Sequence, residues 1–302
     1  MAAAAGSLAA PSLAAPLPSN PDVVVIGAGA AGIGAARRLM AAGRSVVVVE
    51  AAGRIGGRAF TESATFGVPY DHGCAWLQGP RSLPHVALAR DAGFTLVDHS
   101  GAHEAFFIDG ERAGFAERRR QERATPAIHE AIWATPDDVA VASVIPEGLP
   151  YGAEAQTWLA ASYGVDMADC STADVRSYVD YEVDFLVREG LGTLVARLGR
   201  DLPVRLNTAA TAIDWSGAGV HVETTAGTIA AAACIVTVST GVLGAGAIRF
   251  TPDLPADKAE AVADVPMGLL TKIALQFDGA RFGLGEGGWL SYAIPPEIPA
   301  RA

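Results

Sequence analysis

The chain has 302 residues, half of them hydrophobic, and its 22 basic and 33 acidic residues give a net charge of −11. This length can bury a large core and hold two domains. The acidic balance argues against a nucleic-acid-binding protein, which would show a basic patch, and mildly favours attraction of cationic small molecules. No stretch is long and apolar enough to predict a membrane span.

The cysteines and histidines show no metal-ligand pattern. Cys74, Cys170 and Cys234 lack pair spacing, so we expect free thiols. His99 and His103 have the spacing of a helical metal pair, but a glycine lies between them and no third ligand is evident. The sequence therefore predicts a loop here and no metal site.

Residues 1–21 are a low-complexity leader rich in alanine, proline and serine. The leader lacks the basic residues that begin a signal peptide, although Ala2 to Ala15 looks like the apolar and A-x-A parts of one. As written, the sequence therefore predicts a cytoplasmic protein. A start further upstream that supplied basic residues would instead predict a periplasmic one.

The first structural motif is a strand, a helix and a second strand. Val23–Ile26 is a short apolar run, typical of a parallel strand buried on both faces. Residues 33–42 place apolar side chains on one helical face, and Gly43 is a suitable C-terminal cap. A second apolar run, Val46–Val49, ends in Glu50 and completes a βαβ unit.

The glycines of this unit predict a dinucleotide site. Gly27 permits a tight turn, Gly29 lets the backbone approach a pyrophosphate, and Gly32 lets helix and strand pack closely. The helix N-terminus would face the phosphates with unpaired N–H groups and a partial positive charge. Glu50 can accept hydrogen bonds from ribose hydroxyls and would repel a 2′-phosphate, which disfavours NADP. The βαβ unit alone leaves NAD and FAD both open.

A second glycine–arginine cluster follows Glu50. The segment Gly53-Arg54-Ile55-Gly56-Gly57-Arg58 resembles the R-x-G-G-R extension that follows the first βαβ unit in the flavin amine oxidase superfamily. Its glycines would let the backbone lie against the cofactor, and its two arginines can offer forked donors to phosphate. The alternative is an ordinary glycine turn with two solvated arginines. The resemblance implies that the dinucleotide is FAD.

Three later segments carry the same resemblance. Asp71–Gly79 is similar to the family's D-x-G-A-x-W-[IL]-x-G segment, which runs close to the isoalloxazine ring, although alone it predicts only a strand end with a core tryptophan. Leu206–Ile213 resembles the strand that lays its backbone along the adenine, and a plain β-strand is an open alternative. Cys234–Leu243 resembles V-x-V-T-x-P-x-G-V-L, with Ser239 where the family usually has proline.

Lys272 lies inside an otherwise apolar run that reads as a strand from Thr271 onward. A lysine in such a place is unfavourable unless it is partnered or functional. Met267-Gly268-x-x-x-Lys272 matches monoamine and polyamine oxidases and the flavin histone demethylases, in which the lysine holds a water near flavin N5. The resemblance implies the same role for Lys272, and a strand lysine pointing to solvent is the alternative.

The ordered motifs identify the chain, from about Asp22 to about Trp289, as a member of the flavin-containing amine oxidase family, of monoamine or polyamine oxidase type. The catalytic residue implied is Lys272. The FAD-binding residues predicted are Gly27, Ala28, Gly29, Gly32, Glu50, Arg58, Gly73, Cys74, Ala75, Trp76 and Ala210.

The predicted fold is α/β, with a discontinuous Rossmann-like FAD-binding domain, an inserted helical region and part of an antiparallel-sheet substrate domain. We also expect a hairpin turn at Phe106–Gly110, helix over 116–134 and helical character over 174–187. The family's sequences continue beyond residue 302, so we expect a C-terminally truncated member. The predicted segments are the leader 1–21, FAD-binding parts 22–80 and 186–250, the mostly helical insert 81–185, and the start of the substrate-domain sheet, 251–302.

The function implied is FAD-dependent oxidation of a small-molecule amine to an imine, with oxygen as acceptor and hydrogen peroxide as product. A desaturase or porphyrinogen-oxidase-like enzyme on the same fold is one alternative, which Lys272 disfavours. An inactive flavin-fold remnant is another. The sequence leaves the amine, the oligomeric state and covalent attachment of FAD open.

Overall fold

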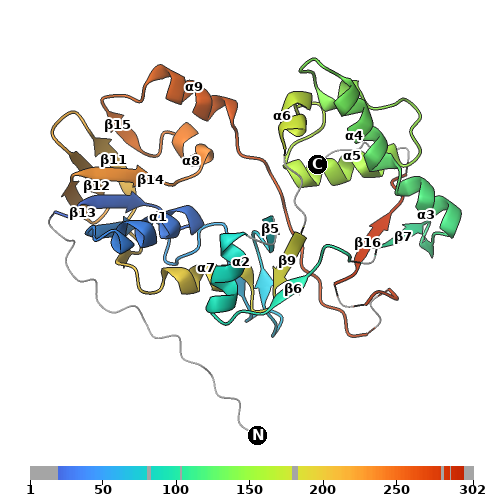
Figure 1. The fold of residues 1–302 in the computed structure, drawn as a ribbon, viewed down its shortest axis with the longest axis horizontal. Helices are drawn as coiled ribbons and strands as arrows, with labels where there is room; N and C mark the ends of the chain where they lie inside the picture. Colours follow the sequence, from blue (N-terminus) through green and yellow to red (C-terminus); the bar gives the residue numbers. More distant parts are fainter. Residues whose placement is uncertain are drawn as a thin grey trace, which may run out of the picture. The chain divides into compact units, whose positions relative to one another are not determined.

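The computed structural model describes residues 20–79, 83–102, 104–178, 183–279, 282–285 and 287–295 (Figure 1). The chain divides into two compact units. Unit 1 comprises residues up to Phe60 together with Val195–Pro266, and unit 2 comprises Thr61–Leu194 together with residues from Met267 onward. The leader, apart from its last two residues, and His103 lie outside the described residues. The domain boundaries at residues 80, 185 and 250 stay predictions.

Unit 1 contains a parallel sheet and a mixed sheet. The order of the parallel sheet is β10-β2-β1-β14, and that of the mixed sheet is β13-β12-β11-β15, in which β11 pairs parallel with β15. The strands are β1 (Val23–Ile26), β2 (Val46–Val49), β10 (Val204–Arg205), β11 (Ala210–Asp214), β12 (Val220–Thr224), β13 (Gly227–Ala231), β14 (Ala233–Val236) and β15 (Arg249–Thr251). The helices are α1 (Ala30–Ala41), α8 (Thr240–Gly244) and α9 (Ala256–Asp264).

The valines of β1 and β2 explain why this sheet is buried on both faces. Val24 and Val47 face a core that contains Ile213 and Val222 of the mixed sheet. Val25 and Val48 face the other way, into a core shared with Ala36 of α1. Since successive strand residues point to opposite faces, a continuous valine run fills both cores at once. The predicted βαβ unit is therefore confirmed.

Unit 2 combines short sheets with a group of packed helices. Its sheets have the orders β5-β9-β6, β16-β7-β8 and β3-β4. The strands are β3 (Thr61–Glu62), β4 (Tyr70–Asp71), β5 (Trp76–Gly79), β6 (Leu96–Asp98), β7 (Glu104–Ile108), β8 (Glu111–Arg112), β9 (Val183–Val187) and β16 (Trp289–Tyr292). The helices are α2 (Pro84–Asp91), α3 (Phe115–Gln121), α4 (Ala124–Ala134), the 3₁₀ turn η1 (Val141–Ser143), α5 (Gly152–Tyr163) and α6 (Thr172–Ser177). Helix α7 (Leu191–Gly199) runs from unit 2 into unit 1.

The helical core of unit 2 lies between α4, α5 and α6. Ile128 and Ile132 of α4, Leu159 of α5 and Val175 of α6 are buried together in it. Spacings of three and four residues place these side chains on one face of each helix. The predicted hairpin turn is confirmed, because Asp109 and Gly110 both adopt the positive φ that a two-residue β-turn of this kind requires.

Three predicted elements differ from the structure. The helix expected over 116–134 is two helices, because Pro126 lacks an N–H to bond Glu122 and instead occupies the first turn of α4. The helical character expected over 174–187 is confirmed as far as Ser177 and is wrong for 183–187, which form strand β9 with alternate residues buried; residues 179–182 lie outside the described residues.

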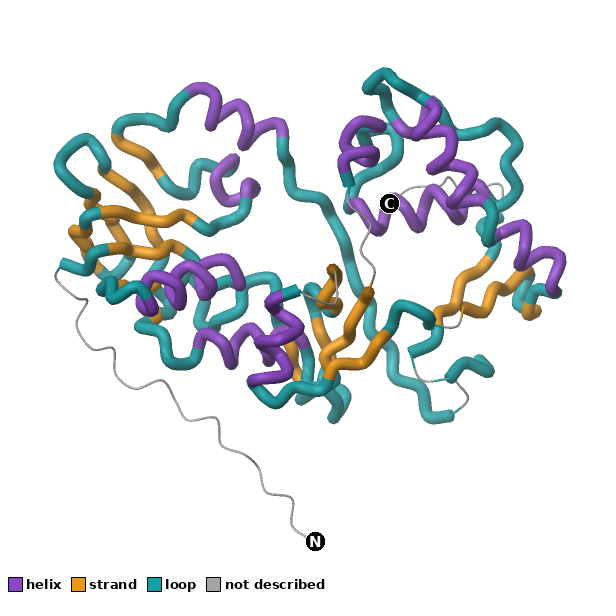
Figure 2. The backbone as a smooth tube through the Cα atoms, viewed as in Figure 1, coloured by secondary structure: helices purple, strands orange, loops and turns teal. Residues whose placement is uncertain are grey.

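The third difference concerns the run after Thr271. Figure 2 shows the described residues between α9 and β16 as loop, and among the described residues no strand pairs with 271–277. A β-ladder needs a neighbour to exchange backbone hydrogen bonds, so this apolar run does not form a strand.

Candidate functional site

The turn between β1 and α1 requires glycine at two positions. Gly27 has φ of +106°, and a Cβ on it would lie 2.7 Å from the hydroxyl oxygen of Thr237. A Cβ on Gly32 would overlap the carbonyl oxygen of Gly27. These contacts explain the predicted tight turn and the close approach of helix to strand.

Gly29 is open on the side where a side chain would project. No atom lies within 4 Å of a Cβ built on Gly29, and among the described residues no side chain caps α1 at this position. The first N–H groups of α1 therefore have the free space and the partial positive charge that suit a phosphate. Ala28, between the two glycines, is fully buried.

Glu50 connects this turn to the end of β2. One of its carboxylate oxygens accepts a hydrogen bond from Ala28 N at 2.7 Å, and the other accepts one from Ala52 N at 2.8 Å. Each oxygen retains a further lone pair, so the half-buried carboxylate can still accept a hydrogen bond from a ribose hydroxyl.

The segment that leads into β11 returns to Glu50. Thr208 N donates to the backbone oxygen of Glu50 at 2.8 Å, and Asn207 N donates to that of Ala52 at 3.0 Å. Ala210 begins β11 two residues later. The structure thus brings the predicted adenine-binding segment alongside the predicted ribose-binding residue.

The Gly56–Gly57 loop lies beside Gly29. Gly56 N donates to Ala28 O at 2.9 Å, and a Cβ on Gly57 would lie 3.2 Å from the Cα of Gly29. Arg54 donates to Gly57 O at 2.8 Å and covers the ring of Phe60 at 4.3 Å, so it braces its own loop, and its contact with phosphate stays a prediction. Arg58 is exposed and stays the arginine predicted to contact the cofactor.

Lys272 in unit 2 is bound by backbone carbonyls. Its Nζ donates to Asp71 O at 3.3 Å and, over a shorter separation, to Gly73 O, and it lies 5.5 Å from the centroid of the Trp76 ring. A lysine ammonium has three N–H donors, and two of them have partners here. The third has no partner among the described residues and can bind a water or another acceptor.

The carboxylate of Asp71 holds the strand end that carries these carbonyls. It accepts hydrogen bonds from Leu191 N at 3.0 Å and Gly192 N at 3.1 Å, at the start of α7, and from the hydroxyl of Thr61. An acceptor at a helix N-terminus satisfies N–H groups that have no partner within the helix. Asp71 therefore ties the Lys272 site to α7.

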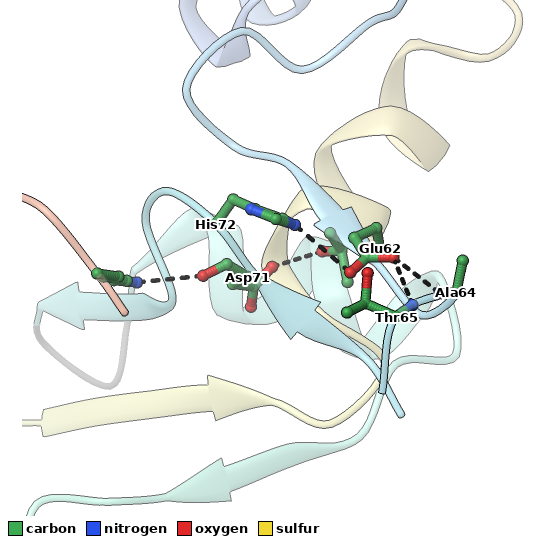
Figure 3. Close-up of polar contacts among 7 residues, drawn as sticks. Glu62, Ala64, Thr65, Asp71 and His72 are labelled. Atoms are coloured by element: carbon green, nitrogen blue, oxygen red, sulfur yellow. Dashed lines mark hydrogen bonds and ion pairs between the residues drawn. The ribbon is translucent and has the colours of Figure 1, made fainter. Parts of the chain in front are cut away.

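The turn before Asp71 has its own polar contacts. Figure 3 shows His72 and Glu62 facing each other, at 3.6 Å between Nε2 and Oε1, with Ala64 and Thr65 donating to the Glu62 carboxylate. Hydrogen bonding from Thr65, first from its side chain and then from its amide, lowers the pKa of Glu62, and the contacts with Ala64 and His72 lower it further. These contacts fix the β3–β4 turn.

The Gly73–Trp76 segment leads into an aromatic cluster. Trp76 stacks on Trp289, with ring centroids 5.8 Å apart and planes 15° apart, and its indole N–H donates to His99 Nδ1 at 3.2 Å. Cys74 is exposed, and Ala75 is half-buried.

No cluster of three or more histidine, cysteine or acidic residues in the described part of the chain is arranged to hold a metal. Burial raises the pKa of the thiols of Cys170 and Cys234, which makes both poor nucleophiles. No helix within the described ranges has the length and apolarity to span a membrane.

Comparison with protein families matches residues 30–163 and 151–293 to the flavin containing amine oxidoreductases. The chain belongs to this family. Its cofactor is FAD, and its mixed α/β architecture is the FAD-binding fold of the family.

Two polyamine oxidases are among the related family members. The chain is 31% identical to polyamine oxidase 4 of Oryza sativa subsp. japonica over 307 residues, covering 90% of this chain and 62% of the relative. It is 30% identical to polyamine oxidase 2 of Arabidopsis thaliana, covering 86% of this chain and 59% of the relative. The chain therefore spans about 60% of the length of these relatives.

Solved structures show the same fold. A double mutant of putrescine oxidase matches with a TM-score of 0.65 at 19% identity, covering 81% of this chain and 63% of that chain. The wild-type putrescine oxidase bound to putrescine matches with a TM-score of 0.61.

Sequence reasoning missed the partners of the predicted residues. Asp71 belongs to a recognised motif, but nothing in the motif indicates that its carboxylate binds the start of α7. Nothing local to His99 or Trp289 indicates that they meet Trp76: His99 lies 23 residues from Trp76, and Trp289 lies much further along the chain.

Proposed function

We propose that the chain supplies the FAD site and the catalytic lysine of an enzyme that oxidises an amine to an imine. The observation that supports this most is Lys272, which is bound by two carbonyls of the predicted flavin-contacting segment and keeps one N–H donor for a water. The proposed cofactor contacts are Gly27, Ala28, Gly29, Gly32, Glu50, Arg58, Gly73, Cys74, Ala75, Trp76 and Ala210.

The reaction needs a two-electron acceptor and a neutral amine. When bound, FAD accepts a hydride equivalent from the carbon next to the amine nitrogen. Overall, the amine and oxygen yield the imine and hydrogen peroxide, and water then hydrolyses the imine to an aldehyde and the free amine or ammonia. Oxygen as acceptor, and a cytoplasmic compartment for the chain as written, belong to the same proposal.

The groups of this protein would bind the cofactor and orient a water and the amine substrate. The α1 N-terminus would hold the pyrophosphate by its N–H groups, and Glu50 would accept a hydrogen bond from a ribose hydroxyl. The free N–H of Lys272 would hold a water, and Trp76 would form an apolar wall that keeps the amine substrate away from bulk water.

An aliphatic di- or polyamine is the proposed substrate class. The relatives at 30–31% identity are named polyamine oxidases, and a structural neighbour is putrescine oxidase bound to putrescine. The net charge of −11 would favour the approach of such polycations.

The test uses the full chain purified with FAD. We expect a yellow protein whose visible flavin absorbance bleaches when putrescine or spermidine is added without oxygen. Lys272→Met should keep FAD and bleach about 100-fold more slowly, the lower end of the scale for loss of general acid–base catalysis, because the water that Lys272 would hold loses its position. Lys258→Met, which changes an exposed lysine of α9, is the matched control and should bleach like the wild type.

Two outcomes would contradict the proposal in different ways. A colourless protein that takes up no FAD would contradict the proposed cofactor site. A yellow Lys272→Met variant that bleaches at the wild-type rate would contradict the proposed role of the lysine.

The alternative of a flavin-fold chain without turnover is favoured by one observation. Leu269, Ile273 and Leu275 follow or flank Lys272 and are 82%, 83% and 71% exposed, so the segment that carries the lysine has little packing support. A yellow protein that bleaches with none of the amines would support this alternative.

A further inference from the structure

His99 joins tryptophans from distant parts of unit 2. We propose that His99, in its neutral form, is a positioning residue that fixes the Trp76 indole beside Lys272, so that amine oxidation requires His99 to be unprotonated. The role in oxidation rests on the proposed function, whereas the positioning of Trp76 does not.

The hydrogen-bond partners of His99 determine its tautomer. Trp76 Nε1 lies 3.2 Å from His99 Nδ1, and an indole nitrogen can only donate, so Nδ1 must be the acceptor. The single hydrogen of the neutral ring is then on Nε2, which donates to Gly287 O at 2.8 Å. Both ring nitrogens are therefore used, and only the neutral Nε2–H tautomer satisfies both partners.

The same ring packs against the aromatic cluster. His99 lies 5.2 Å from Trp289 and 6.1 Å from Trp76 between ring centroids, and Trp158 meets Trp289 edge to face at 5.6 Å. Stacking restrains the plane of Trp76, but it leaves the ring able to slide within that plane. The bond to His99 adds the directional contact that fixes where the indole edge points.

The indole so fixed lies next to the catalytic lysine. Lys272 Nζ is 5.5 Å from the Trp76 ring centroid, and Gly73, one of its carbonyl partners, lies three residues before Trp76. A change in the Trp76 rotamer would therefore alter both the wall beside Lys272 and the strand end that binds it.

Protonation of His99 would break this arrangement. An imidazolium carries a hydrogen on Nδ1 as well, so two N–H groups would point at each other where one hydrogen bond now exists. The elements around His99 also carry charged side chains that can affect its titration. These are Lys272 beside Trp76, Asp98 on β6, Asp184 on β9, Glu104 on β7 and Glu154 on α5.

The direct test observes the Trp76 indole without turnover. In the FAD-loaded full chain labelled with ¹⁵N-tryptophan, the Trp76 indole N–H resonance, assigned through Trp76→Phe, should shift as pH falls from 8 to 5. His99→Gln should abolish the shift, because glutamine can accept from the indole and does not titrate. His221→Gln, at an exposed histidine of unit 1, is the control and should leave the shift unchanged.

The kinetic test separates positioning from folding. One pH unit below the midpoint of the indole titration about one-tenth of His99 is neutral, so the rate of anaerobic flavin reduction in the wild type should fall about 10-fold relative to His99→Gln. At pH 8 the two proteins should agree within about 3-fold, whereas His99→Leu, which removes both bonds, should be slower than either at every pH.

The outcomes divide cleanly. An indole resonance that does not titrate, or that still titrates in His99→Gln, overturns the positioning of Trp76 by His99. If the indole titrates as expected and wild type and His99→Gln keep the same pH profile, the link to oxidation is overturned. A chain that oxidises no amine refutes the proposed function and leaves the indole test intact.

Discussion

The two units build their candidate sites in different ways. In unit 1 the turn at Gly27–Gly32 is closed mainly by contacts within one βαβ motif, with Glu50 22 residues from its partner Ala28, and Thr237 adds one long-range contact. In unit 2 Lys272 is bound by carbonyls 199 and 201 residues away. A local motif can be recognised from sequence, whereas a site assembled across such separations depends on the topology that brings its parts together.

The units also differ in how much apolar surface they bury around these sites. Apart from the half-buried Val23, the valines of β1 and β2 are almost completely buried between two cores. Beside Lys272, Leu269, Ile273 and Leu275 remain more than 70% exposed. Exposed apolar residues in such a run are typical of an interaction surface. The candidate site of unit 1 is therefore packed more completely than the candidate site of unit 2.

The largest effect on stability is expected when a side chain is placed in the tight turn of unit 1. Gly32→Ala should lower the free energy of unfolding by about 3 kcal/mol and abolish FAD binding, because its Cβ would overlap Gly27 O. Chemical denaturation and the flavin absorbance measure both effects. Gly34→Ala lies in the same helix with no atom within 4 Å of its Cβ and should be neutral or stabilising by up to about 1 kcal/mol.

The corresponding change in unit 2 is Asp71→Ala. It leaves the N–H groups of Leu191 and Gly192 without their acceptor and should lower the free energy of unfolding by about 1–2 kcal/mol. It should also slow flavin reduction, since Asp71 holds the strand end that binds Lys272. Asp91→Ala, at the exposed C-terminal end of α2, is the control. Equal stability of the two variants would show that Asp71 does not support the site.

The stability of the protein should fall at alkaline pH because of a tyrosine in unit 2. Hydrogen bonding to Glu117, with a 2.6 Å bond, and then burial raise the pKa of Tyr151 to about 12. The folded state holds this proton more tightly than the unfolded chain, so its contribution is complete below about pH 10 and is lost as pH rises through about 12. Denaturation midpoints measured between these values should fall in the wild type more steeply than in Tyr151→Phe.

The smallest effect is expected at the exposed run beside Lys272. Ile273→Ser should change the free energy of unfolding by less than about 0.5 kcal/mol, because the side chain is 83% exposed. It should nevertheless reduce the fluorescence of a bound hydrophobic dye. Ile213→Ser, at a buried position of unit 1, should instead destabilise strongly. A large loss of stability in Ile273→Ser would show that this run is packed in solution.

The sequence by itself determined the nucleotide half of the site. A valine run, glycines at fixed spacing and a terminal acid are sufficient because each acts on residues within the same βαβ motif. The identities of Lys272 and Trp76 were also predictable, through the order of the family's motifs. Their surroundings were not, and neither was strand β9, whose residues were expected to be helical.

Only the tertiary structure decided which groups those residues meet. Asp71 faces the start of α7, Arg54 turns back onto its own loop, and His99 and Trp289 converge on Trp76. The physical reason is that a hydrogen bond or a ring contact depends on separation in space, and no periodicity in the sequence encodes the distance between residues far apart in the chain. The glycine turn was recognisable because its glycine spacing and most of its contacts are local, whereas the surroundings of Lys272 were not because they are long-range.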